Sequence, residues 1–399
     1  MSLLFTPVRI GAVTLDNRLV QSATYEGMAD VSGAVTDDLI ERYRGSARGG
    51  IGLIIPGHLY VHPQGKAMKY QTGIHSDEMI PGLERLVRAV HGEGGKIAFQ
   101  LNHAGRQTIP AIAGKKPIAP SSYGWDPRSF VKPSKMNQKM IVRTIESFQA
   151  AAVRAVAAGV DAIQLHAAHG NLINQFLSPY FNHRRDAWGG SDEKRFRFLK
   201  SVVVSVRKKM PARMPLLLKL NTRDYTPWAG VTPYLAKTYA AWLVDIGIDM
   251  IELSCGTSNY SFMNMCRGDV PVEAFVSGMP AWKKRVGRVV LNRLKGRYDL
   301  EEGYNVAAAR TIKPAIGDVP LSVVGGFRRR SRMEEALNKG FADLISMSRP
   351  FICEPNLARR FKEGRQEEAA CRSCNRCLAA AASDRPVKCY CEELPKSNA

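Results

Sequence analysis

Two histidines, His166 and His169, stand three residues apart beyond an apolar run. Residues 161–165 are typical of a short buried strand, so both imidazoles would follow its carboxyl end, with Asn171 close behind. A strand-end histidine can be a buried core residue, a metal ligand or a hydrogen-bond donor. No acidic residue stands here as in an HExxH zinc motif, which makes metal ligation the poorest of these interpretations. We therefore predict that two imidazoles converge on one pocket.

Five of the eight cysteines crowd the segment 371–391. Cys371, Cys374 and Cys377 are each separated by two residues, and Cys389 follows after eleven more. Four thiolates on two tight turns and one return can hold zinc or an iron–sulfur cluster. Cys391 is a rival for Cys389 as the fourth ligand. The remaining alternative is that these cysteines hold no metal.

The elements that would position these side chains alternate between strand and helix. Helical spacing over residues 141–158 places Ile141, Phe148 and Ala152 on one face, and Gly159 follows where a helix would end. Eight short apolar runs predict strands at 18–23, 51–56, 96–101, 161–165, 216–220, 250–253, 321–324 and 343–347. Repeated strand and helix units indicate α/β architecture, here a (β/α)8 TIM barrel with its active site at the carboxyl ends of the strands.

The remaining length forms loops and an appendage. Long loops after the third strand (102–137) and the sixth (254–299) would overhang the pocket as lids. We predict a barrel over residues 1–355 and a short C-terminal appendage over 356–399, which carries a helix and the cysteine segment.

Charge and composition limit the choice of partners. The chain has 399 residues, 45% of them hydrophobic, and a net charge of +21. Its basic residues are spread along the sequence without a nucleic-acid motif, so we predict a solvated basic surface and no nucleic-acid partner. No leader or membrane-spanning stretch is visible, which favours a cytoplasmic protein without a membrane partner.

Two glycine- and serine-rich motifs end the last two strands. Gly325 and Gly326 follow the seventh strand, and Ser348 and Arg349 follow the eighth. Loops at these two positions commonly bind phosphate in TIM barrels, because glycine lets backbone N–H groups approach the anion and arginine adds a forked donor. We predict a phosphate site here.

Taken together, these motifs resemble the Old Yellow Enzyme family of FMN-dependent oxidoreductases over residues 4–364. The resemblance is carried by the segments NRLV (17–20), SAT (22–24), PQG (63–65), QLNHAGR (100–106), HAAHG (166–170) and FLSP (176–179), by Asn182, Arg184 and Asp186, and by Gly189 and Gly190.

The resemblance implies a set of FMN-binding residues. The isoalloxazine would meet backbone groups of Ala23, Thr24 and Gly57, the Gln100 amide and the Lys219 cation. The phosphate would meet the motif described above, which comprises Gly325, Gly326, Ser348 and Arg349. His166 and His169 would donate hydrogen bonds to a carbonyl or nitro oxygen and so polarise the substrate for hydride transfer.

Asn171 departs from the family pattern. Ene reductases of the family usually carry a tyrosine here that protonates the substrate carbon, and an amide is no comparable acid. Water, Tyr25, Tyr180 or Tyr260 would have to take over this step.

The cysteine segment resembles the 2,4-dienoyl-CoA reductase and trimethylamine dehydrogenase branch of the family. That resemblance implies a 4Fe–4S cluster on Cys371, Cys374, Cys377 and Cys389. Members of that branch continue into a second domain that binds FAD or ADP and a nicotinamide. Electrons would here come from a partner subunit or directly from NAD(P)H.

The function predicted from the sequence is FMN-dependent, NAD(P)H-driven reduction of an activated carbon–carbon double bond in a small electrophile. One alternative is a flavin-dependent amine dehydrogenase or demethylase, which would need an aromatic bowl for an ammonium group. Another is an electron-transfer subunit of a larger flavoprotein complex. We also expect a homo-oligomer.

Overall fold

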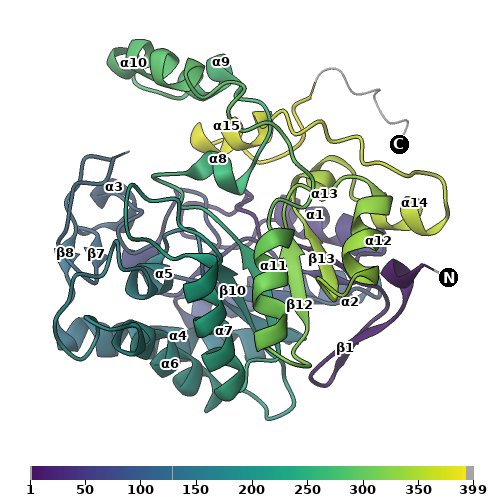
Figure 1. Ribbon diagram of the computed structural model, residues 1–399, viewed down its shortest axis with the longest axis horizontal. Coiled ribbons are helices and arrows are strands. Elements are labelled where there is room, and N and C mark those ends of the chain that lie inside the picture. The colour runs from purple at the N-terminus through teal and green to yellow at the C-terminus, as the bar shows by residue number, and fades with distance from the viewer. Residues whose placement is uncertain (1, 128, 392–399) are drawn as a thin grey trace.

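The protein folds as a parallel β-barrel surrounded by helices, shown in Figure 1 by a computed structural model that describes residues 2–127 and 129–391. The nine parallel strands follow the order β4-β3-β13-β12-β11-β10-β9-β6-β5. A parallel bridge between Ile54 of β4 and Ile97, just before β6, closes the ring. The strands are β3 (Leu19–Gln21), β4 (Leu53–Ile54), β5 (Leu59–Tyr60), β6 (Ala98–Asn102), β9 (Ala162–Ala167), β10 (Leu216–Asn221), β11 (Met250–Ser254), β12 (Leu321–Val324) and β13 (Leu344–Met347).

These strands confirm the predicted barrel. Each of the eight predicted apolar runs overlaps a strand, and β5 continues the second one after a break at Gly57. Both β4 and β5 lie beside β6, so together they fill one of eight positions in the ring.

Helices form the outer layer. They are α1 (Asp37–Arg48), α2 (Ile80–His91), α4 (Gln138–Ala157), α6 (Asp192–Arg207), α7 (Pro233–Asp245), α11 (Val306–Ile312), α12 (Arg330–Asn338) and α14 (Leu357–Lys362). The long helices begin at good capping residues: Asn137 and Ser191 accept hydrogen bonds from the N–H groups of the first turn. On α4 the predicted apolar face is buried, including Ile141, Phe148 and Ala152. Burial of these faces against the strands forms the main core.

An N-terminal hairpin closes the bottom of the barrel. Strands β1 (Val8–Ile10) and β2 (Val13–Leu15) pair antiparallel, a feature that the sequence analysis missed because each strand has three residues. Ile10 and Leu15 pack against Val20, Leu217 and Met250 at the amino ends of the strands. This apolar floor keeps water out of the lower barrel.

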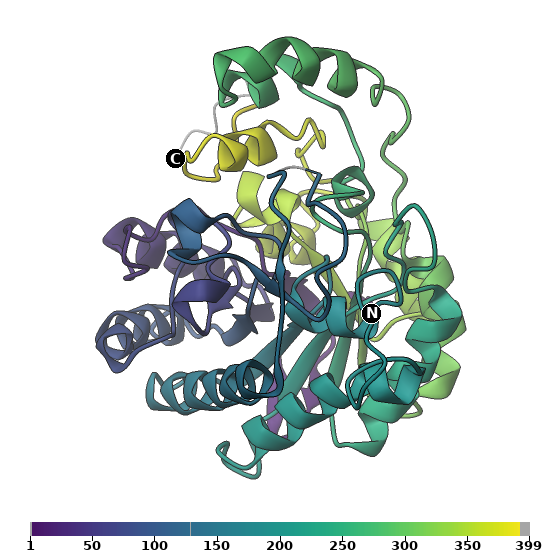
Figure 2. The same cartoon turned by 90° about the vertical axis from the view of Figure 1, so that its left-hand side faces the viewer.

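The long loops lie at the opposite end of the barrel. The loop after β6 carries α3 (Pro110–Ala113), β7 (Ile118–Ala119) and β8 (Ser134–Lys135), and the loop after β11 carries α8 (Phe262–Met265), α9 (Val272–Ser277) and α10 (Ala281–Asn292). Asn259 of the second loop donates a hydrogen bond to Asp126 of the first. Figure 2 shows α9 and α10 at the top of the molecule, away from the barrel.

Short elements complete the chain. They are α5 (Leu172–Leu177), α13 (Arg349–Cys353), α15 (Arg376–Ala382) and the 3-10 turns at Leu3–Phe5, Pro63–Gly65, Asp77–Met79 and Lys313–Ala315. Leu357, Ala358 and Phe361 of α14 are buried in the main core, whereas α15 packs against α9. The division of the chain near residue 355 stays a prediction. Among residues 2–127 and 129–391, no helix combines the length and the hydrophobicity needed to cross a bilayer.

Candidate active site

The inside of the barrel is built in three tiers, because side chains two residues apart on a strand point to the same face. The lowest tier belongs to the apolar floor and consists of Val20, Ala98, Ala162, Leu217, Met250 and Leu344. Two residues further along the same strands, the middle tier is polar and consists of Ser22, Gln100, Gln164, Lys219, Glu252 and Ser346. The upper tier, again two residues on, consists of Thr24, Asn102, His166, Asn221, Ser254 and Ser348.

Five of the six middle-tier residues form one buried hydrogen-bond network, and Ser346 pairs with Ser322 beside it. The Gln100 amide Nε2 donates to Gln164 Oε1 at 2.6 Å, and Gln164 Nε2 donates to Glu252 Oε2 at 2.9 Å. Ser22 Oγ donates to Glu252 Oε1 at 2.7 Å and accepts from Lys219 Nζ at 2.8 Å. The sequence analysis predicted Gln100 and Lys219 but missed Glu252, which stands alone as an acid in an apolar strand.

Lys219 and Glu252 form an ion pair inside this network. Their charged atoms lie 3.4 Å apart, and the side chains are 2% and 0% exposed. Burial lowers the pKa of Lys219, and the Glu252 carboxylate opposes that shift. Removing either partner would leave a buried charge uncompensated.

The two predicted histidines lie together above the network. Their ring centroids are 5.0 Å apart, and His169 Nε2 lies 2.6 Å from Ser254 Oγ. His166 is 3% exposed, and its Nδ1 has no hydrogen-bond partner among residues 2–127 and 129–391. Loss of solvation lowers the pKa of both histidines well below 6.5, with a smaller contribution from the Lys219 cation. Both rings are therefore neutral at physiological pH, and each keeps one N–H donor.

A third histidine, His58, joins this group. Its ring centroid is 5.8 Å from that of His166, and burial lowers its pKa to about 4. The sequence analysis missed it, although it directly follows the predicted Gly57 at a break between two strands.

Gly57 lies against a buried acid. Its N–H donates to Glu26, which also accepts from the Tyr43 hydroxyl. Burial raises the pKa of Glu26, and the Tyr43 hydrogen bond opposes this shift. A Cβ atom at Gly57 would lie 2.5 Å from Glu26 Oε2 and from the Thr24 carbonyl, so only glycine fits here. The Gly57 N–H is thus already used by the protein, and Glu26 is a further residue that the sequence analysis missed.

The predicted phosphate residues follow the adjacent strands β12 and β13. Thr24 Oγ1 lies 2.6 Å from Ser348 Oγ, which joins the ends of β3 and β13. Gly326 has a φ of 73°, in the left-handed region that favours glycine. The Arg349 guanidinium donates to the Arg267 carbonyl at 2.8 Å and to Asn375 Oδ1 at 2.6 Å. Arg349 thereby ties the barrel to both the loop after β11 and the cysteine segment.

Asn171 and the tyrosines that could replace it as proton donor occupy different surroundings. Asn171 is 4% exposed, and its Oδ1 accepts a hydrogen bond from Asn102 at 3.1 Å. Tyr25 packs against Cys377, and burial raises the pKa of its hydroxyl. The ring of Tyr180 is 5.2 Å from that of Tyr260, and burial raises its pKa.

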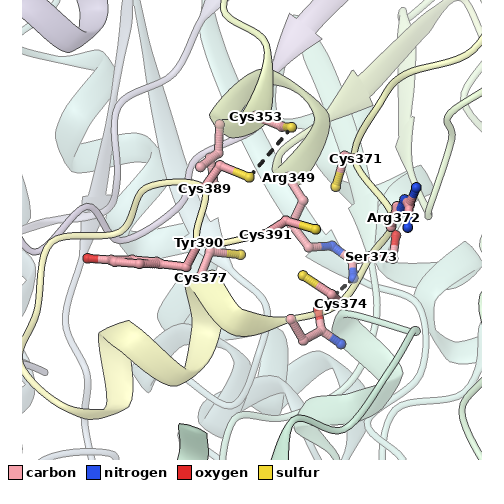
Figure 3. Close-up of a pocket in the computed structure, with 12 residues that line it drawn as sticks. Arg349, Cys353, Cys371, Arg372, Ser373, Cys374, Cys377, Cys389, Tyr390 and Cys391 are labelled. Carbon is pink, nitrogen blue, oxygen red and sulfur yellow. Dashed lines mark hydrogen bonds between the residues drawn. The ribbon is translucent and has the colours of Figure 1, made fainter. Parts of the chain in front are cut away.

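The four predicted metal-ligating cysteines line one pocket (Figure 3). Cys371, Cys374, Cys377 and Cys389 share it with Cys391 and with Cys353, the last residue of α13. Cys353 was not predicted to take part; its Sγ lies 3.6 Å from Cys389 Sγ. Within the described ranges, no three or more His, Cys, Asp or Glu side chains are arranged to hold a metal ion.

Comparison with known proteins identifies the family. The sequence profile of the NADH:flavin oxidoreductase / NADH oxidase family matches residues 3–254 and 297–368. A 4,4'-dithiodibutanoate disulfide reductase from Rhodococcus erythropolis is 33% identical over 382 residues, which cover 94% of this chain and 92% of that protein. The family match leaves out residues 255–296, which carry α8, α9 and α10.

Two solved structures share the fold. An Old Yellow Enzyme homologue from Zymomonas mobilis has a TM-score of 0.73 and 26% identity, covering 92% of this chain and 94% of its own. A complex of 2-naphthoyl-CoA reductase with 2-naphthoyl-CoA has a TM-score of 0.85 and 25% identity, covering 97% of this chain but 56% of its own. The chain thus spans little more than half of that reductase. The predicted resemblance to the Old Yellow Enzyme family is confirmed.

Proposed function

The chain belongs to the NADH:flavin oxidoreductase / NADH oxidase family, and from this premise we propose that it uses NAD(P)H and FMN to reduce an activated carbon–carbon double bond. The expected substrate is a small electrophile of the enone or enoyl type, or a related electron-poor group. Similarity to a disulfide reductase and to a naphthoyl-CoA reductase supports a reductive role without fixing the acceptor.

The observation that carries this proposal is the buried, unpaired Nδ1 of His166 beside His169. A buried polar atom without a partner is costly, and a ligand oxygen at this position would satisfy a neutral imidazole that donates its N–H. His169 supplies the second ring; Ser254 Oγ holds its ring nitrogen, and its backbone N–H donates to Asn221 Oδ1 at 3.3 Å. Two aimed donors would draw electrons from a conjugated carbonyl.

The residues around the tiers fit FMN. Gln100 and Lys219 would offer an amide and a cation to the pyrimidine edge, and Gly325, Gly326, Ser348 and Arg349 would hold the phosphate end. When bound, FMN would supply hydride transfer from NAD(P)H to the acceptor. Lys219 would favour the negative charge of the reduced form, and its pairing with Glu252 limits that effect.

Another group than Asn171 must give the proton that the substrate carbon receives. Its amide bonds to Asn102 and has no acidic proton to give. Water entering the mouth, or the Tyr180 hydroxyl, would protonate the substrate carbon.

We also propose that Cys371, Cys374, Cys377 and Cys389 bind a 4Fe–4S cluster. Six thiols in one pocket give the all-sulfur donor set that such clusters use, although the thiols do not adopt a metal-ready arrangement. Anaerobic purification with iron and sulfide assays tests this, and zinc analysis identifies the alternative metal. Protein that contains no iron, with or without zinc, would contradict it.

Oxidation of a methylated amine is a second candidate, favoured by one feature. The Tyr180 ring lies 5.1 Å from Trp228 and 5.2 Å from Tyr260. Aromatic faces attract ammonium groups. Trp188 bonds to Gln138, and Trp242 packs against Phe196 on the outer helices, so neither contributes to this group.

Assembly and location are part of the proposal. We propose that the protein acts in the cytoplasm as a homo-oligomer, and that an electron-donor subunit supplies any cluster. Light scattering of the purified protein measures the oligomeric state.

Turnover tests the main proposal. FMN-loaded protein should oxidise NADH or NADPH when supplied with an enone, a nitro compound or a quinone, and should return the saturated product from the enone. Flavin reduction by tertiary amines without enone turnover would favour the second candidate. Protein that turns over no acceptor, and whose flavin no amine reduces, would contradict both.

A further inference from the structure

Helix α10 has apolar side chains on both of its faces. On the inner face, Leu291 is 6% exposed and packs in a cluster with Phe275 and Val276 of α9. On the outer face, Trp282, Val286, Val289 and Val290 are 74%, 65%, 51% and 51% exposed. These four positions have the i, i+4, i+7, i+8 spacing that aligns side chains along one stripe of a helix. In ordinary soluble proteins such a stripe is covered.

The outer stripe lies among cations. Residues 281–297 contain seven Lys or Arg residues and no Asp or Glu, so this segment contributes +7 to a net charge of +21. The cations are Lys283, Lys284, Arg285, Arg288, Arg293, Lys295 and Arg297. Arg288 is partly balanced by Glu273 of α9 at 2.9 Å.

A second loop brings further aromatic side chains to this place. Trp125 and Phe130, in the loop after β6, are 66% and 61% exposed. Lys283 Nζ lies 5.4 Å from the centre of the Phe130 ring, so this loop reaches α10. We call the set Trp125, Phe130, Trp282, Val286, Val289 and Val290 the apolar ridge.

We propose that the apolar ridge and its cations bind the surface of an anionic membrane. Figure 1 shows α10 projecting from the body of the molecule. A fluid bilayer can cover a projecting helix, whereas a protein partner would need a matching groove. Tryptophan, phenylalanine and valine then enter the acyl boundary, while lysine and arginine contact lipid phosphates.

Location and family comparison agree with this role. The ridge lies entirely on loops that follow the carboxyl ends of β6 and β11, on the side of the molecule where His166 lies. Helix α10 falls within the residues that the family profile does not match. The proposal replaces the prediction from the sequence of a solvated basic surface without a membrane partner.

Vesicle binding of the full FMN-loaded chain tests the proposal. Co-sedimentation with phosphatidylcholine vesicles is compared with vesicles that contain about 30% phosphatidylglycerol, at low and high salt. We expect binding to increase about tenfold or more with the anionic lipid and to weaken with salt. Tryptophan fluorescence should shift to shorter wavelength on binding.

Matched variants assign the binding surface. Trp282→Ser/Val286→Ser/Val289→Ser should lower vesicle affinity by about tenfold or more, since it removes most of the inserted stripe. The control Val142→Ser/Val153→Ser/Val204→Ser changes valines that are 41%, 46% and 41% exposed on α4 and α6, and should leave affinity unchanged. Unchanged NAD(P)H oxidation without vesicles verifies folding of both variants.

Two outcomes would overturn the proposal. One is the absence of binding to anionic vesicles at low salt, and the other is equal binding by the α10 variant and the parent chain. If the parent chain binds no vesicles but binds a purified acidic protein, and the α10 variant does not bind that protein, the ridge would belong to a protein partner instead.

Discussion

The polar tiers of the barrel and the cysteine pocket both place reactive side chains close together, but they do so by different means. In the barrel, Gln100, Lys219 and Glu252 occupy fixed positions on paired strands, and each has partners without any ligand. In the pocket, Cys371, Cys374 and Cys389 come from turns and loops. Strand register therefore organises the first site in advance, whereas the second has donor atoms whose final arrangement depends on what binds.

The largest expected effect is a loss of stability when the charge pair of the barrel is broken. Lys219→Met should lower the free energy of unfolding by about 3–5 kcal/mol, because Glu252 would stay buried without its partner. Urea unfolding of flavin-free protein measures this. The double variant Lys219→Met/Glu252→Gln should recover most of the loss. Equal stability of the single variant and the parent chain would contradict a buried charge pair.

The next effect concerns catalysis above the network. His166→Ala should lower kcat/KM for an enone by about 10²–10³-fold, since it removes an aimed donor. The flavin spectrum should be retained. As a control, His91→Ala removes a histidine that pairs with Asp161 at the opposite end of β9 and should leave kcat/KM unchanged. A small effect of His166→Ala would place substrate recognition elsewhere.

Lowering the pH should lower the free energy of unfolding, because of a buried histidine at the mouth of the barrel. Burial lowers the pKa of His103, at the end of β6, to about 3. The unfolded chain binds a proton near pH 6.5 and the folded chain does not, so stability is lost as pH falls below that value. Between pH 6.5 and 5 this residue should account for a loss of about 2 kcal/mol.

A variant isolates that contribution. In His103→Asn an amide oxygen can still accept the Gly105 N–H hydrogen bond that His103 Nδ1 accepts at 3.0 Å. Its unfolding free energy, measured in urea at several pH values, should fall less steeply with acid than that of the parent chain. Parallel pH profiles would mean that His103 is protonated in the folded protein.

A tyrosine at position 171 tests whether the site lacks a proton donor. Because Asn171 is buried against Asn102, tyrosine needs space there, and Asn102→Ala/Asn171→Tyr should accept it better than Asn171→Tyr alone. If protonation limits turnover, the double variant should raise enone kcat by about tenfold or more. Stopped-flow kinetics separate this step from flavin reduction. An unchanged kcat with a well-folded variant would show that the proton comes from elsewhere.

The smallest effect on stability is expected in the pocket. Without metal, Cys371→Ser should change the free energy of unfolding by less than about 1 kcal/mol, since no fixed network is broken. The same variant should lose bound iron, whereas Cys255→Ser, at a buried thiol outside the pocket, should keep it. Iron content of Cys353→Ser, Cys389→Ser and Cys391→Ser then identifies the fourth ligand.

The same contrast explains what could be predicted from the sequence. Apolar runs and helical spacing identified the eight strand positions, because register and burial leave a periodic signal. The middle-tier residues lie at every second position of those strands, so the sequence could have indicated them. Glu252 was missed because it looked like an isolated acid in an apolar run. His58 and Glu26 were missed because they lie at irregular breaks after strands. Cys353 was missed because it meets the other cysteines only through folding of α13 against a distant segment.

The packing of the cysteine segment against the loop after β11 affects how the protein assembles. Asn375 Nδ2 binds the Cys266 carbonyl at 2.9 Å, although the two residues are 109 positions apart in the chain. Ser373 fits against Gly268, and α15 supports α9. During synthesis the loop that bears α10 is therefore made well before the C-terminal segment that packs against it. Until then the apolar side chains of α9 that pack against α15 stay exposed together with the outer stripe of α10, and such transiently exposed apolar surface favours binding of a chaperone.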